Sequence, residues 1–329
     1  MLLQLFKKSY FIQISWVVFF AIILAIPGFF FQNIGIWPNN TLFFQLVQPP
    51  AFLLINWVNQ LLFFFLILFL SFYLKVVLTK HHLVHHLNFI PSLLVILLFN
   101  FYHEGQFQLI GGINLFLLIL AFSHLLESFD NVKPDNNIFS AAFLISIATL
   151  LSYTNLVFIL IVWLSFFVFQ NYSWRYFPIT IVGIITPYFF FLTWLFWEDK
   201  LMSIENEWYL IIQTIYEIPL FDSLFHIIIT SILGFFIFLS LAKIIPETPG
   251  KIIAIRKKTS LSLYYLVLSI FPFLFSQDII VKNIILIPLA GIMGYYLRAV
   301  KARRRWIDLL FTIFVILIIG HQYYSLYVT

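Results

Sequence analysis

The chain has 329 residues, of which 63% are hydrophobic and 9% are charged. Soluble domains carry roughly 25% charged residues, so this composition excludes a soluble domain and favours an integral membrane protein. The net charge of +5 is interpreted as a marker of membrane orientation, and no nucleic-acid partner is expected. Cysteine is absent, which excludes disulfides and thiolate metal sites, and no cofactor is expected.

Apolar runs recur almost from end to end of the chain. Each run is continuous rather than alternating, which predicts helices instead of barrel strands. Since roughly 20 apolar residues cross the hydrocarbon core as a helix, we expect an all-α, polytopic transmembrane helix bundle of about 11 spans. It fills a single integral membrane domain, residues 1–329. The expected cores are 11–31, 52–74, 89–103, 109–126, 138–152, 155–171, 178–197, 224–243, 261–275, 279–297 and 308–328.

The first run follows Lys7 and Lys8 and is too long for the apolar region of a signal peptide, so it is expected to be the first membrane helix. Further along, the cores 138–152 and 155–171 are joined by two residues only. They form either two full spans or a re-entrant hairpin.

The longest expected outer loop covers residues 198–223. Within it Ile204, Trp208, Ile211 and Ile215 recur at helical spacing. This pattern predicts an outer amphipathic helix over about residues 203–217 that lies on the membrane surface or caps a cavity.

Lys and Arg are distributed asymmetrically across the predicted membrane. With the N-terminus in the cytoplasm, all but two of the 18 Lys and Arg residues lie on the cytoplasmic side, and the exceptions are Lys200 and Lys282. Every inner loop then obeys the positive-inside rule, which supports the predicted helix count and places the C-terminus, Thr329, outside. The outer side is acidic instead.

The sharpest local motif is the run of residues 81–86, His-His-Leu-Val-His-His. On a helix, His81 with His85 and His82 with His86 form two i,i+4 pairs, a spacing that can share a metal ion. The run also contains the H-x-x-H-H string of membrane desaturases, but the other histidines lie in or near separate spans. The favoured interpretation is a polar cytoplasmic turn that contacts lipid headgroups, with no metal.

Outer acids are the candidate catalytic residues, namely Glu104, Asp199 and Asp278. Acids at the lip of a membrane cavity can act as general bases or bind a divalent cation, although outer-loop acids are also ordinary solubilising residues. Lys282 follows Asp278 by four residues. The pair is either a simple i,i+4 ion pair or the phosphate contact for a lipid-linked substrate. No span centre carries an ionisable Asp, Glu, Lys or Arg, which argues against an ion-coupled transporter or a pump.

Several short motifs follow one another in the middle of the chain. In order they are Glu127-Ser128-Phe129-Asp130, residues 143–148, Leu150-Leu151-Ser152-Tyr153, Trp163, Trp174-Arg175-Tyr176 and residues 183–188. This order resembles an uncharacterised multi-pass inner-membrane family, a domain of unknown function, of Bacteroidota and especially flavobacteria. The resemblance implies a bacterial cytoplasmic (inner) membrane and brings no activity. The chain departs from that pattern at Thr154-Asn155, where prolines are expected.

A looser likeness is to multi-pass polyprenyl-phosphate-sugar glycosyltransferases. It rests on the uneven span lengths, the central hairpin and the charged outer segment from Asp278 to Pro288. Those enzymes resemble one another in an acid in the first outer loop, and residues 32–50 contain none. If the fold is shared, the catalytic acid has moved or is lost.

Two functional expectations follow. The first is a structural or assembly component of a cell-envelope complex, with the lipid bilayer and other inner-membrane proteins as partners, because no catalytic set converges. The alternative is a glycosyltransferase-like or flippase-like protein that acts on a polyprenyl-linked or lipid substrate at the outer leaflet. In that alternative Glu104, Asp199 or Asp278 is the base or metal ligand, and Lys282 holds a phosphate.

Overall fold

The protein is helical throughout the residues that the computed structural model describes, with no strand among them. These residues are 2–6, 10–30, 55–103, 108–131, 133–170, 173–201, 224–275, 282–299 and 305–328. The helices are α1 (Leu2–Leu5), α2 (Tyr10–Phe30), α4 (Asn56–Lys80), α5 (Ile90–His103), α6 (Gln108–Asp130), α7 (Asp135–Leu151), η2 (Tyr153–Phe158), α8 (Ile159–Phe169), α9 (Tyr176–Trp197), α11 (Leu224–Glu247), η3 (Thr248–Gly250), α12 (Ile253–Phe275), η4 (Asn283–Ile285), α14 (Leu286–Ala299) and α15 (Arg305–Val328).

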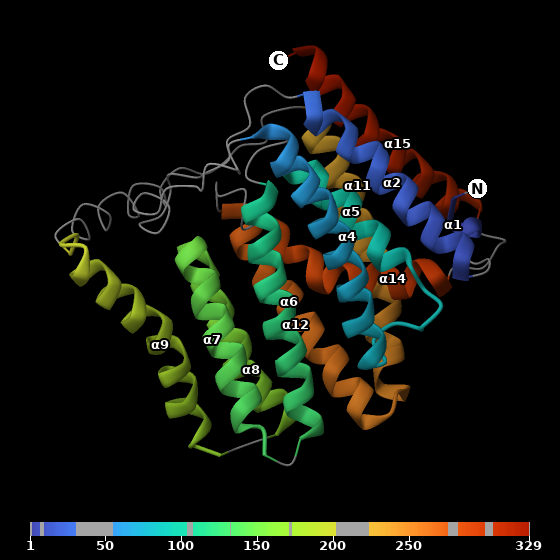
Figure 1. The fold of residues 1–329 in the computed structure, drawn as a ribbon. Helices are drawn as coiled ribbons and strands as arrows, with labels where there is room; N and C mark the ends of the chain where they lie inside the picture. The colour runs from blue at the N-terminus through green and yellow to red at the C-terminus, as the bar shows by residue number, and fades with distance from the viewer. Residues whose placement is uncertain are drawn as a thin grey trace.

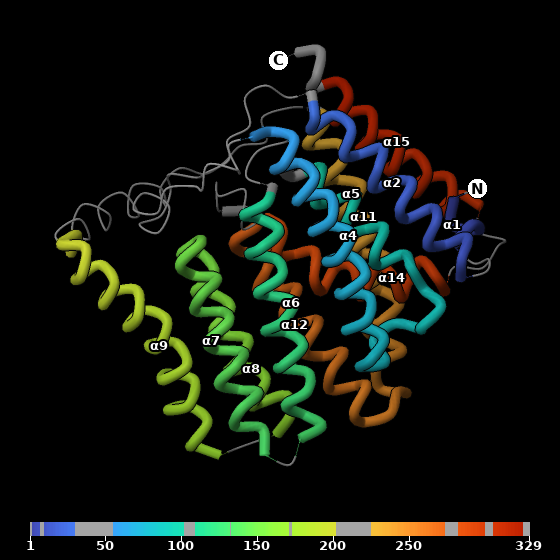
Figure 2. The backbone as a smooth tube through the Cα atoms, viewed as in Figure 1, coloured from blue at the N-terminus to red at the C-terminus, as the bar shows by residue number. Residues whose placement is uncertain are grey.

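All eleven expected segments overlap helices of this fold. Among the described residues six helices, α2, α4, α6, α9, α11 and α15, are long and apolar enough to cross a membrane. Shorter apolar helices accompany them, as expected for a multi-pass membrane protein. Figures 1 and 2 show α9 at one edge of the bundle and α2 with α15 at the opposite edge.

The centre of the bundle is formed by two short helices, α5 and α14. Both are buried on nearly every side, as expected for helices that are apolar all round. They pack against each other so closely that a Cβ on Gly294 would lie 2.6 Å from Pro91 Cγ, so glycine permits this contact. Just before α5, Asn88 Nδ2 donates to the Gly294 carbonyl at 2.8 Å. Length alone therefore does not decide which apolar runs face lipid.

The first and last parts of the described chain pack together. The Leu3 amide on α1 donates to Asp308 Oδ1 on α15 at 3.0 Å. Further along α15, Gln322 Nε2 donates to the Leu24 carbonyl of α2 at 2.9 Å. All four residues are buried, so these contacts are shielded from the surroundings of the protein.

The α9 helix is attached to the bundle mainly through α7. A Cβ on Gly183 would lie 2.9 Å from the Ala142 Cβ, so the two helices meet at a small-residue contact of the kind common between membrane helices. Further along the two helices, the hydroxyls of Thr149 and Tyr188 lie 2.7 Å apart. Only 22% of the apolar window of α9 is buried, the smallest share among the six long helices.

The hairpin formed by α7, η2 and α8 turns inside the bundle. At its tip Asn155 is fully buried, and its Nδ2 donates to Asn114 Oδ1 at 2.9 Å and to the Ala148 carbonyl at 2.7 Å. Because Asn114 lies six residues into α6, the tip is roughly 9 Å below the start of that helix. The two arms of the hairpin are therefore shorter than the helices beside them.

Candidate functional site

The best-defined polar cluster lies where α4, α6 and α12 end or begin. We call this part of the molecule the basic end, because it carries Lys80, Lys257, Lys258 and Arg298. Asp130 is the last residue of α6, and Lys258 lies in the second turn of α12. The segment from 81 to 89 connects α4 to α5 at the same end.

The histidine run forms a turn, as the favoured interpretation of the sequence predicts. It does not form the helix on which the two i,i+4 histidine pairs of the metal hypothesis depend. The helix α4 ends at Lys80, and His82 has a left-handed backbone with φ 56°. The His82 amide donates to the Thr79 carbonyl, and the Leu83 amide donates to the Leu78 carbonyl. These two bonds are those of a Schellman motif, so His82 closes the helix end.

The buried centre of the cluster joins a lysine, a carboxylate and a histidine. Lys258 Nζ lies 2.8 and 2.7 Å from the two Asp130 carboxylate oxygens and 3.1 Å from His81 Nδ1. The Lys258 and His81 side chains are 7% and 1% exposed, whereas that of Asp130 is 50% exposed. The ammonium is therefore buried, and its counter-ion keeps access to water.

His81 is neutral in this environment. Burial, followed by the neighbouring Lys258 charge, lowers the pKa of His81 to about 4. A neutral ring accepts the Lys258 hydrogen bond at Nδ1, which assigns its proton to Nε2. Among the described residues the buried Nε2 has no hydrogen-bond partner. The ring is thus a second acceptor for the buried ammonium.

The other histidines of the run lie toward a separate pocket. The rings of His85 and His86 stack with their centroids 4.3 Å apart, and both border a cavity of about 510 Å³ together with Arg298. Arg298 donates to the Leu87 carbonyl at 2.7 Å. Burial, the neighbouring His86 and Arg298 all lower the pKa of His85. Within the described part of the chain, no group of three or more His, Asp or Glu side chains is placed to hold a metal ion.

Further charged contacts at the basic end also join one helix to another. Lys80 of α4 pairs with Glu127 of α6 at 2.6 Å. Lys257 of α12 donates to the Phe169 carbonyl and to Gln170 Oε1 at the end of α8, at 3.2 and 2.9 Å. The network therefore connects α4, α6, α8 and α12.

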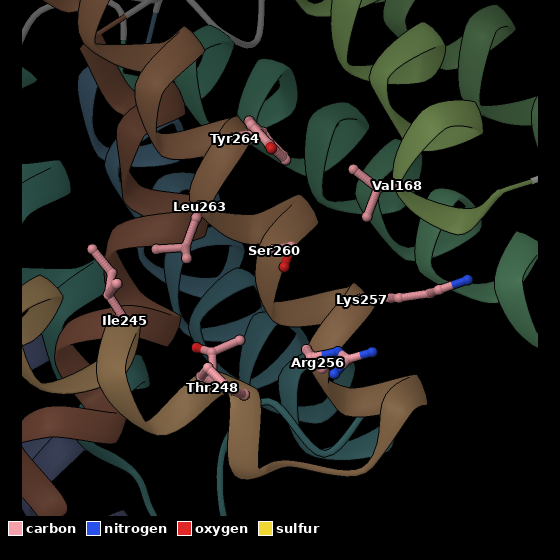
Figure 3. Close-up of a pocket in the computed structure, with 9 residues that line it drawn as sticks. Val168, Ile245, Thr248, Arg256, Lys257, Ser260, Leu263 and Tyr264 are labelled. Atoms are coloured by element: carbon pink, nitrogen blue, oxygen red, sulfur yellow. The ribbon is translucent and has the colours of Figure 1, made fainter.

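A second feature of the basic end is a pocket of about 520 Å³, shown in Figure 3. It lies between the end of α11, η3, α12 and α8. Arg256 and Lys257 border it, and Ser260 and Tyr264 follow along α12. No sequence motif marks this pocket.

The outer candidate residues divide between described and undescribed parts of the chain. Glu104, Asp278 and the expected amphipathic helix at 203–217 lie outside the described residues. Asp199 follows α9, and Lys282 precedes η4 and α14. These two lie on elements with different neighbours, since α9 packs mainly on α7, and α14 packs on α5, α11 and α12. The convergent outer acid site stays a prediction.

Asp199 has a clear structural role at the end of α9. Its backbone is left-handed, with φ 54°. Its amide donates to the Phe196 carbonyl at 3.2 Å, and the Lys200 amide donates to the Leu195 carbonyl at 3.0 Å. This is again a Schellman motif, in which Asp and Asn are tolerated better than most residues other than glycine.

Comparison of the chain with protein-family models, with curated proteins and with solved structures finds no match. The family resemblance stays a prediction. Some of its motif residues do meet in the fold, because Ser146 Oγ donates to the Ile184 carbonyl at 2.7 Å and Gly183 allows α7 and α9 to approach.

Sequence reasoning missed the Lys258–Asp130 pair and the Arg256 pocket. The two members of the pair are 128 residues apart, and nothing in the sequence links the cytoplasmic cation Lys258 to Asp130. A usable signal was the position of Lys258, which follows two other cations at the start of an apolar run. Three consecutive side chains on a helix cannot all face solvent equally.

Proposed function

We propose that the protein is a structural or assembly component of a cell-envelope complex in the bacterial inner membrane. The observation that carries this proposal is the use of charge at the basic end. Lys80, Lys257 and Lys258 each connect two helices, through Glu127, the end of α8 and Asp130 respectively. Such contacts hold the helices of this end in a fixed arrangement.

In this proposal the basic end faces the cytoplasm, with the N-terminus inside, about 11 spans and the C-terminus outside. The positive-inside rule supports this orientation. The charged contacts described above then lie at the cytoplasmic membrane surface, where water and headgroups can solvate the exposed carboxylate of Asp130.

The α9 helix is the surface that we assign to a partner's transmembrane helix. It is bound to the rest of the molecule mainly by α7 and leaves a wide face uncovered. Phe189, Phe190 and Phe196 on this face are 62%, 65% and 68% exposed. Van der Waals packing between helices of this kind drives association inside a bilayer.

The test is purification of the tagged chain from native membranes in a mild detergent. We expect stoichiometric membrane-protein partners. A double substitution on α9, Phe189→Ala with Phe190→Ala, should release them, whereas Phe238→Ala on α11 should retain them. Phe238 is a matched control because it is 67% exposed on another long helix. Recovery of the chain alone, with lipid as its only companion, would refute the proposal.

A further inference from the structure

The pocket in Figure 3 lies where α11 ends and α12 begins, and an exposed face of α12 continues from it; we call the pocket and this face together the groove. Both helices pack on α14, and α12 also packs on α8. Ile244, Leu266 and Ile292, one from each of α11, α12 and α14, form a small apolar cluster. Leu263 belongs to the pocket lining and also packs on this cluster. The pocket is therefore bordered by apolar packing on the side of Leu263.

The α12 wall of the groove changes steadily in polarity. Arg256, Ser260, Tyr264, Val267 and Phe271 recur at spacings of four, four, three and four, which places them on one face of the helix. Figure 3 shows the first three of them in succession along α12. Val267 and Phe271 continue the face and are 63% and 58% exposed. This face of α12 therefore begins with a guanidinium, continues with two hydroxyls and ends with exposed apolar side chains.

The polar end of this face is electropositive and able to accept a ligand. Its lining contains Arg256 and Lys257 and no acidic residue. The Lys257 ammonium is held by the end of α8. For the Arg256 guanidinium, the described residues provide no hydrogen bond or ion pair. Arginine in such a position favours the bidentate binding of phosphate oxygens.

The acid on the same hairpin, Glu247, does not line the pocket. Glu247 Oε2 accepts a hydrogen bond from Tyr295 of α14 at 2.8 Å, and Glu247 Oε1 lies 3.9 Å from Lys243 one turn earlier. Its carboxylate is therefore engaged by Tyr295 and Lys243 and is not part of the pocket lining, which carries the two cations.

We propose that this groove binds an anionic phospholipid from the membrane leaflet at the basic end. The phosphate lies against Arg256, with Lys257 adding to the local positive field. The glycerol region lies beside the hydroxyls of Ser260 and Tyr264, and an acyl chain follows Val267 and Phe271. A phospholipid runs from a charged phosphate through a polar glycerol region to an apolar chain, and the residues of the groove follow the same order. A free phosphate would contact only the charged part of the groove. Basic pockets between membrane helices commonly recognise acidic headgroups.

The test uses the purified full-length chain in a non-ionic detergent, without any partner protein. Dioctanoyl phosphatidylglycerol, dioctanoyl phosphatidylcholine and inorganic phosphate are titrated separately, and bound molecules are counted by native mass spectrometry. Both lipids carry the same phosphate, but phosphatidylcholine adds a quaternary ammonium that Arg256 and Lys257 repel. We therefore expect the affinity for phosphatidylglycerol to be at least roughly tenfold higher than that for phosphatidylcholine.

Two variants alter the groove in different ways. Arg256→Gln removes the charge and should weaken phosphatidylglycerol binding about tenfold. Ser260→Phe fills the space between the charge and the acyl path and should weaken binding by a similar factor while it leaves every cation in place. The control is Arg175→Gln, because Arg175 is also exposed and precedes α9 at the same end of the bundle. It should not change the affinity.

Three results would overturn the proposal. Equal binding of the two lipids would remove the anionic specificity. An equal effect of Arg175→Gln and Arg256→Gln would indicate a general basic surface rather than this groove. Inorganic phosphate that binds as tightly as phosphatidylglycerol would assign the pocket to a soluble phosphate. Since the readout is lipid binding by the isolated chain, it does not depend on the proposed assembly role.

Discussion

The buried ion pair between Lys258 and Asp130 makes an asymmetric prediction about stability. Asp130→Ala leaves an ammonium whose side chain is 7% exposed with only His81 Nδ1 as an acceptor. Lys258→Met instead leaves a carboxylate whose side chain is already half exposed, and water can solvate it. Asp130→Ala, at the exposed partner, should therefore destabilise the protein more than Lys258→Met, at the buried partner.

The magnitudes follow from burial. Removal of one partner of a fully buried pair costs about 3–5 kcal/mol, and we lower this to about 2–3 kcal/mol for Asp130→Ala because one side of the pair faces solvent. For Lys258→Met we expect about 1 kcal/mol or less, since the methionine retains most of the apolar packing of the lysine stem.

The assay is equilibrium unfolding in mixed micelles with increasing sodium dodecyl sulfate, followed by the fluorescence of the nine tryptophans. The control is Lys80→Met, which removes a similar pair with Glu127 from an exposed position and should cost less than about 1 kcal/mol. If Lys258→Met is more destabilising than Asp130→Ala, or if both are as mild as Lys80→Met, the reasoning from burial is wrong.

Three other predictions concern single residues. Because the folded pKa of His81 is about 4 and the unfolded value is 6.5, the unfolded chain binds an extra proton between these values, so stability falls as pH falls through this window. In the same unfolding assay, we expect the free energy of unfolding to fall by about 2 kcal/mol from pH 7 to pH 5. An equal fall in the His81→Asn variant would contradict this. Gly183→Ala should destabilise by about 1–3 kcal/mol because its Cβ meets that of Ala142, whereas Gly234→Ala, with no atom within 4 Å, should be neutral or slightly stabilising; similar effects of the two would argue against a tight α7–α9 contact. Asp199→Gly should retain the stability of the protein, whereas Asp199→Val should lower the free energy of unfolding by about 1–2 kcal/mol. If Asp199→Gly folds normally but fails to rescue a knockout phenotype, the carboxylate has a chemical role.

The positions of the helices could be predicted from the sequence because each depends on a local apolar run. The same signal could not separate helices at the bundle surface from buried ones. α5 and α9 have similarly apolar sequences, yet α5 is enclosed on all sides and α9 is mostly exposed. Which helices surround a given helix depends on contacts between distant segments, such as that of Gly294 with Pro91, and these leave no periodic pattern in the sequence.

The charged run Arg256-Lys257-Lys258 shows the same limit at the level of side chains. In the sequence it is simply three cytoplasmic cations. On a helix consecutive residues differ by roughly 100° in direction, so the three side chains have three different environments. Arg256 borders the groove, Lys257 binds the end of α8, and Lys258 is buried beside Asp130. The candidate sites depend on these directions, and only the surrounding helices determine what each direction meets.

The contact between α2 and α15 has a consequence for the synthesis of the protein. The hydrogen bond from Gln322 of α15 to the Leu24 carbonyl of α2 joins residues 298 positions apart, and that from the Leu3 amide of α1 to Asp308 of α15 joins residues 305 apart. At roughly 5–20 residues per second, the ribosome needs about 15–60 s between the two partners. During that interval α2 can be held only by helices made soon after it, such as α4 and α5. The face of α2 that later receives α15 is meanwhile open to lipid and to any chaperone of membrane insertion. Closure of this pair is therefore a late step in biogenesis, and a chain truncated before α15 leaves α2 without this partner.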